Sequence, residues 1–213
     1  MSCANFDPGF FDAALKAGAA DHFDFLAVHP YENLGAAMAG GESAYLSMAG
    51  NLRAMLKAND QPADMPLMIT ETGIKAPIQP SAAEDIRQAE ALVKVYVLSM
   101  AQGFSRIDWF EARGPAYGKG TDLGIIREDW SLRPSYHAMK NMTGILGDNP
   151  QYLGWLLTGE SGFGFVFDSG ERKVLVAWSP ADADNSLSFS EPVNVVQALG
   201  ESSELASGEQ LGL

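Results

Sequence analysis

Polar and aromatic side chains follow three short apolar segments of this 213-residue chain. They are His29 and Tyr31 at the end of the first segment and just beyond it, Glu71 at the end of the second, and Trp109 and Glu111 at the end of the third and just beyond it. Carboxylates and imidazoles hydrogen-bond to hydroxyl groups, and Trp or Tyr rings stack on apolar ring faces. A carboxylate beside a glycosidic carbon can also act as nucleophile or acid/base. These residue types together favour a carbohydrate site.

The three apolar segments are predicted strands, over Phe23–His29, Leu67–Glu71 and Arg106–Phe110. Because side chains alternate along a strand, we expect Ile69 to share the face of Glu71. The same alternation puts Ala27, His29 and Tyr31 on one face of the first strand, and Ile107, Trp109 and Glu111 on one face of the third. Each of these faces starts apolar and ends polar or aromatic. The pattern therefore predicts that the five side chains converge.

Helical patterns alternate with these strands. The predicted helices are Asp12–Ala20, Ser43–Asn59, a helix that opens with a Ser81–Glu84 capping box and ends before Gly103, and Ser135–Met142. Alternating strands and helices imply a parallel sheet with helical crossovers. Long, irregular loops are expected at 30–42, 72–80 and 112–133. Sites in such folds form at the carboxyl ends of the strands, which is where the five side chains lie.

The chain changes character near residue 147. We expect residues 1–147 to form the α/β part and residues 148–213 to form a small antiparallel, β-sandwich-like accessory domain. Its predicted strands are Gly164–Phe167, Lys173–Trp178, Leu187–Phe189 and Val193–Leu199. A turn over 168–171 joins the first two of these strands.

The segments around the five residues resemble clan A glycoside hydrolases, the retaining (β/α)8 TIM-barrel enzymes. Ile69-Thr70-Glu71-Thr72-Gly73 is similar to their strand-seven motif, and Val28-His29-Pro30-Tyr31 to their strand-six segment. Ile107-Asp108-Trp109-Phe110-Glu111 resembles strand eight. Gly124-Ile125-Ile126, followed by Arg133-Pro134-Ser135-Tyr136-His137-Ala138, resembles the link into the last helix. The resemblance covers about residues 7–145 and implies a partial TIM barrel, strands six to eight, followed by the small β domain.

The resemblance also implies roles. Glu71 would be the catalytic nucleophile, His29 and Tyr31 would line the subsite at the cleaved bond, Trp109 would be a sugar platform, and Glu111 would contact substrate. The acid/base Glu of the clan usually follows an Asn after strand four, and no Asn-Glu pair occurs in this chain. We therefore expect a fragment whose missing N-terminal barrel half, or a partner chain, supplies the acid/base. Such a fragment would have little turnover alone.

Composition excludes several other classes. With 14 Lys+Arg and 27 Asp+Glu, the formal net charge is −13, which argues against nucleic-acid or anionic membrane partners. No apolar run approaches a membrane span. The single Cys3 rules out an internal disulfide, and three His with no His-x-His pattern argue against a multi-His metal centre. Carboxylate-rich Mg²⁺ or Ca²⁺ sites stay open at this level. We expect no cofactor.

Two matters stay open at this level. A non-catalytic carbohydrate-binding or structural fragment is the alternative to an enzyme.

The first residues lack the basic start and apolar stretch of a signal peptide. Because enzymes of this kind are often secreted or periplasmic, we expect any export signal of a full-length protein to lie outside this chain.

Overall fold

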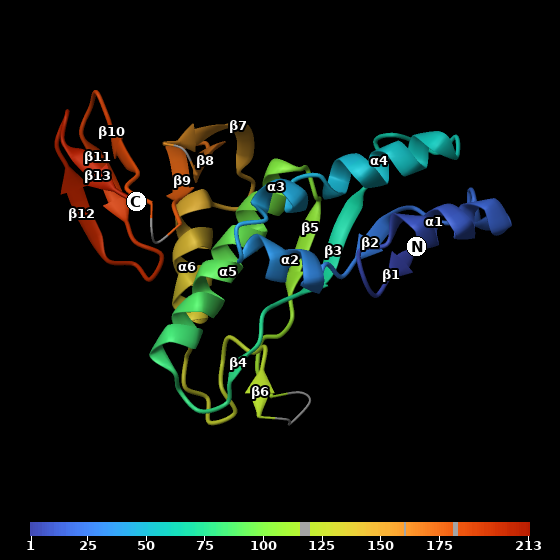
Figure 1. The fold of residues 1–213 in the computed structure, drawn as a ribbon, viewed down its shortest axis with the longest axis horizontal. Helices are drawn as coiled ribbons and strands as arrows, with labels where there is room; N and C mark the ends of the chain where they lie inside the picture. The colour runs from blue at the N-terminus through green and yellow to red at the C-terminus, as the bar shows by residue number, and fades with distance from the viewer. Residues whose placement is uncertain (116–119, 160, 181–182) are drawn as a thin grey trace.

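A four-stranded parallel sheet forms the centre of the computed structural model, which describes residues 1–115, 120–159, 161–180 and 183–213. The spatial order is β1-β2-β3-β5 (Figure 1). The strands are Ser2–Cys3 (β1), Leu26–Val28 (β2), Leu67–Thr72 (β3) and Arg106–Trp109 (β5). The three expected strands are therefore present. β1 adds a fourth, which is too short to show any periodicity in the sequence.

Helices connect each strand of this sheet to the next and follow the last one. They are α1 (Pro8–Ala14) continuing as the π-helical η1 (Leu15–Ala19), α2 (Tyr31–Ala37), α3 (Glu42–Tyr45), α4 (Met48–Ala58), α5 (Ala82–Ala101) and α6 (Pro134–Leu146). The helix expected over 43–59 is divided into α3 and α4. The expectation of an irregular loop at 30–42 is wrong, because α2 forms there and buries Leu34 and Ala37 one helical turn apart.

The strand register corrects the predicted phase of β3. Val28 pairs with Ile69, and Ile69 pairs with Ile107. Val28 and Ile69 are fully buried in the core that includes the helices, so this row faces the helices. The β3–β5 register then shifts, so that Thr72 rather than Glu71 pairs with Trp109. One extra residue reverses the alternation, and Glu71 therefore does not share the face of Ile69.

The long loops after β3 and β5 are joined by a short antiparallel ladder. It consists of β4 (Ala76–Pro77) and β6 (Thr121–Asp122), at the lower edge of Figure 1. The expectation of a capping box at the start of α5 is wrong. Ser81 is the N-cap residue, but its hydroxyl makes no capping hydrogen bond. The Asp85 carboxylate, not that of Glu84, accepts from the Ser81 backbone N–H at 3.1 Å.

The tail is built from antiparallel strands, as expected. One sheet has the order β7-β8-β9, and two separate ladders pair β10 with β13 and β11 with β12. The strands are Gln151–Thr158 (β7), Gly162–Asp168 (β8), Lys173–Trp178 (β9), Ser186–Ser188 (β10), Val193–Val196 (β11), Ser202–Leu205 (β12) and Gln210–Gly212 (β13). The sequence pattern did not indicate β7, β12 or β13, because none of them alternates cleanly between apolar and polar residues.

The three-stranded tail sheet packs on the α/β part. Phe165 and Phe167 of β8 are fully buried in the same core as the apolar side of α5. Trp178 of β9 donates from its indole N–H to Glu42 of α3 at 3.2 Å, and Lys94 of α5 reaches the same carboxylate at 2.7 Å. The division near residue 147 therefore separates two kinds of secondary structure that share one hydrophobic core. In the described ranges no helix combines the length and apolarity needed to cross a membrane.

Candidate active site

Glu71 lies at the end of β3 with two polar neighbours from the preceding crossover. The Tyr31 hydroxyl donates to Glu71 Oε2 at 3.1 Å, and His29 Nδ1 lies 3.4 Å from the same oxygen. His29 Nε2 lies 3.2 Å from Thr70 Oγ1, which fixes the imidazole ring from its other side. The Glu71 side chain keeps 35% of its surface accessible. The structure thus brings His29, Tyr31 and Glu71 together around one accessible carboxylate.

Local features of the chain explain this arrangement. Tyr31 is not on a strand, as its predicted phase required, but is the first residue of α2, directly after Pro30. The register shift in β3 brings Glu71 to the side of His29. Gly73 permits the end of β3 to approach β5 closely, since a Cβ at this position would lie 2.3 Å from the Phe110 carbonyl oxygen. A side chain at residue 73 would therefore push the two strand ends apart.

A cavity of about 590 Å³ opens beside the carboxylate. Its lining residues are Tyr31, Glu71, Gly73, Ile74, Lys75, Arg87, Phe110 and Leu123. This volume is within the range of small-ligand sites, and the lining combines apolar surface with a few charged or hydroxyl groups. The cavity therefore places apolar surface and two cations beside one carboxylate.

Trp109 and Glu111 both bond to Leu123, which lines the cavity. The Trp109 indole N–H donates to the Leu123 carbonyl at 3.0 Å, and its ring packs at the edge of the hydrophobic core. Glu111 is held in the loop after β5 through its backbone, which pairs with Leu123 and Ile125. Neither residue is among the described residues that line the Glu71 cavity, whereas Phe110, which sequence reasoning did not single out, is.

A buried ion-pair network holds the loops around the cavity. The guanidinium of Arg133 is fully buried and bonds to Asp85, to Asp122 at 2.8 Å and to the Pro77 carbonyl at 2.9 Å. Arg127 adds a second contact to Asp85 at 2.7 Å. These bonds join β4, β6 and the first turn of α5 to the start of α6. The network therefore fixes the loops that carry the cavity walls.

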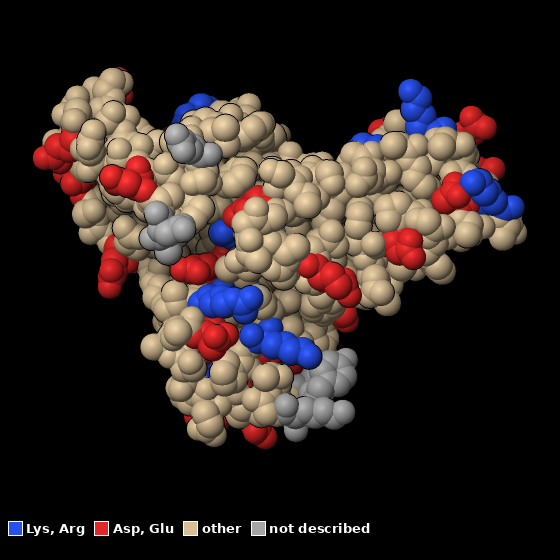
Figure 2. Space-filling view, in the orientation of Figure 1, with Lys and Arg blue, Asp and Glu red and all other residues tan. Residues whose placement is uncertain are grey.

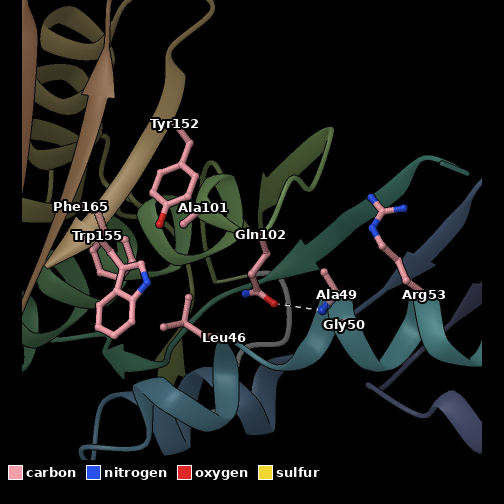
Figure 3. A pocket seen from close by; sticks show the side chains of 9 residues that line it. All are labelled: Leu46, Ala49, Gly50, Arg53, Ala101, Gln102, Tyr152, Trp155 and Phe165. Atoms are coloured by element: carbon pink, nitrogen blue, oxygen red, sulfur yellow. Dashed lines mark hydrogen bonds between the residues drawn. The ribbon is translucent and has the colours of Figure 1, made fainter. Parts of the chain in front are cut away.

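A second cavity of about 370 Å³ lies between α4 and β7 (Figure 3). It is lined by Leu46, Ala49, Gly50, Arg53, Ala101, Gln102, Tyr152, Trp155 and Phe165. Its described lining includes no carboxylate or imidazole, so these residues offer no group for glycosidic chemistry. The described part of the chain also contains no group of three or more His, Cys, Asp or Glu side chains placed to hold a metal ion.

The alternation of side chains along the predicted strands could not identify every residue of the Glu71 cavity. Lys75 and Arg87 lie in the loop after β3 and in α5, and nothing in the strand pattern directs them to the site. The signal for Phe110 was its position at the end of the third predicted strand. The phase chosen for this strand was that of Ile107 and Trp109, which both pack against the hydrophobic core, so it passed over Phe110.

Comparison with solved structures links this fold to sugar-cleaving enzymes. The chain is similar to a family 39 glycoside hydrolase from the gut symbiont Bacteroides cellulosilyticus WH2, with a TM-score of 0.70, 20% identity, and coverage of 97% of this chain and 46% of that chain. It is also similar, with a TM-score of 0.37 and 15% identity, to a glycosylated family 10 endo-beta-1,4-xylanase from Gloeophyllum trabeum, over 61% of this chain and 50% of that one.

Comparisons with protein families and with curated proteins gave no match. The fold is therefore like that of part of a glycoside hydrolase, and the predicted resemblance to clan A is confirmed at the level of fold. The chain spans about half the length of the solved structures that it matches.

Proposed function

We propose that this chain is the C-terminal half of a retaining glycoside hydrolase and that Glu71 is its nucleophile. The observation that supports the proposal best is the position of the Glu71 carboxylate. It lies at a strand end, lines a cavity, and is held by Tyr31 at 3.1 Å. Both Tyr31 and His29 contact Oε2, and no described residue hydrogen-bonds to Oε1. Oε1 is therefore the oxygen available for attack.

The reaction would follow the two-step course of retaining enzymes. Glu71 Oε1 forms a bond to the anomeric carbon while the glycosidic C–O bond breaks, and the leaving oxygen takes a proton from an acid. Water, deprotonated by the same group, then displaces Glu71 and releases the sugar. Tyr31 donates to the Glu71 carboxylate and orients it during both steps. Phe110 lines the cavity and offers an apolar ring face to the sugar, in the role first proposed for Trp109.

The acid/base would come from outside this chain. Retention requires a second carboxyl about 5–5.5 Å from the nucleophile. Glu71 is the only carboxylate among the described residues that line the cavity. Glu111 keeps its proposed role in substrate contact only if substrate extends beyond the cavity toward the loop after β5. We therefore assign the proton transfers to the missing part of the barrel.

The open sides of the central sheet support a missing half. β1 and β5 each pair with one neighbour among the described strands, so both edges of the sheet are open. On the face away from the helices, Arg106 and Asp108 pair with each other at 2.8 Å and keep 63% and 38% of their side chains accessible. Four strands are half of an eight-stranded barrel, and closure would pair both edges. We propose that β1, β2, β3 and β5 are strands five to eight, completed by a preceding half or a partner chain.

A non-catalytic carbohydrate-binding role is the second candidate. It is favoured by the same lack of a second carboxylate in the described cavity lining. The two candidates differ in whether a covalent intermediate forms. The dinitrophenolate of a dinitrophenyl 2-deoxy-2-fluoro glycoside leaves without acid assistance, so this reagent tests the nucleophile alone. Stoichiometric labelling of Glu71 in the protein expressed from the complete reading frame would support the enzyme, and reversible binding without a label would support the alternative.

A further inference from the structure

Two cations line the cavity beside Glu71. Lys75, two residues beyond Gly73, and Arg87, in the second turn of α5, face the same space as Glu71 and Tyr31. Lys and Arg are 14 of the 213 residues but two of the eight that line this cavity. On the face shown in Figure 2, basic side chains lie below α2 with acidic side chains beside them. The cavity is therefore locally more basic than the chain.

These two cations are not held in close ion pairs. Arg87 Nη1 lies 4.0 Å from Glu84 Oε2, with both side chains nearly half exposed. Lys75 takes part in no ion pair within 4.0 Å among the described residues. By contrast, Arg127 and Lys94 each lie 2.7 Å from a carboxylate. In a chain with 27 acidic residues, Lys75 and Arg87 therefore keep donors available to a ligand.

We infer that the substrate of this site carries an anionic substituent, a carboxylate or a sulfate ester, that is bound by Lys75 and Arg87. A net charge of −13 repels anions at long range, so an anionic sugar needs local cations to bind. The planar guanidinium of Arg87 can meet a carboxylate or sulfate with two parallel hydrogen bonds. A neutral sugar would gain nothing from these charges. The inference rests on the proposed function, because it places the sugar beside Glu71.

Paired ligands that differ only in charge test the inference. Methyl β-D-glucuronide is compared with methyl β-D-glucoside, and the galacto pair likewise, by calorimetric titration of the protein expressed from the complete reading frame. Glucose 6-sulfate is a third arm that separates a sulfate ester from a carboxylate. We expect the charged member of at least one pair to bind about tenfold more tightly, which corresponds to about 1.4 kcal/mol. In the double variant Lys75→Gln/Arg87→Gln this ratio should fall close to one.

A matched control and salt dependence complete the test. Lys140→Gln, on the exposed side of α6, removes a charge outside the cavity and should leave the ratio unchanged. Raising the salt concentration should weaken the charged ligand and leave the neutral one unaffected. Equal binding of charged and neutral members, no binding of either, or a ratio that survives the double variant would overturn the inference.

The outcome is separable from that of the proposed function. Glu71 labelling by neutral and charged fluoro-glycosides at equal rates would leave the nucleophile in place and refute the anionic substrate. Tight binding of a uronide or sulfated sugar without any labelling of Glu71 would support the anionic ligand and refute the catalytic role.

Discussion

Replacing Arg133 by Met should destabilise the chain far more than the loss of an exposed ion pair. The Arg133 side chain has no accessible surface, and it bonds to Asp85, Asp122 and the Pro77 carbonyl. In the variant Asp85 keeps Arg127 at 2.7 Å. Asp122, 1% accessible, keeps only the backbone N–H of Gly124 at 2.9 Å among its described partners. Because a buried carboxylate would be left without its cation, we expect a loss of about 3–5 kcal/mol in the free energy of unfolding.

Urea denaturation followed by circular dichroism measures this loss. Arg106→Met is the control, because Arg106 pairs with Asp108 at the surface, where such pairs contribute about 0–1 kcal/mol. Adding Asp122→Asn to Arg133→Met removes the uncompensated charge and should recover about 1–3 kcal/mol. The reasoning is refuted if Arg133→Met is no more destabilising than Arg106→Met, or if the second substitution recovers nothing.

Three further changes have defined outcomes. Tyr31→Phe removes a hydrogen bond to a carboxylate, which is worth about 1.5–3 kcal/mol. It should slow fluoro-glycoside labelling of Glu71 roughly tenfold to hundredfold without loss of fold. An unchanged labelling rate would exclude an orienting role for Tyr31. Gly73→Ala places a Cβ against the Phe110 carbonyl oxygen and should lower the free energy of unfolding, measured by urea denaturation, by about 1–3 kcal/mol. An unchanged free energy would show that the strand ends can separate freely. Burial raises the pKa of Tyr96 to about 12, so the unfolded chain loses this proton at a lower pH than the folded chain. The free energy of unfolding should therefore fall between about pH 10 and pH 12. Ultraviolet titration showing Tyr96 ionised near pH 10 would contradict this expectation.

The order of elements in the α/β part could be predicted because its signals are local. Apolar runs bounded by Pro and Gly marked β3, and the stripe of α5 marked the longest helix. The end of each strand was also visible, since the residue type changes from apolar to polar at that point. These features depend on neighbouring residues alone, so the sequence carries them.

Register could not be predicted, because it depends on the partner strand. The extra residue between Ile69 and Thr72 has no mark in the sequence, and it reverses the face assigned to Glu71. His29 and Glu71 still lie side by side, because the register shift brings Glu71 to the face of the sheet that carries His29. For Trp109 the predicted face did not lead to the cavity, and Phe110 lines it instead. Lys75 and Arg87 were missed because loop and helix positions reach the site only through tertiary packing.

Labelling the protein from the complete reading frame with a dinitrophenyl 2-deoxy-2-fluoro glycoside, and mapping the label by peptide mass, tests the central claim most directly. The account predicts one sugar per chain, on the peptide that contains Glu71, and no label in Glu71→Gln. A label on another residue, or labelling that persists in Glu71→Gln, would contradict the assignment of Glu71 as nucleophile.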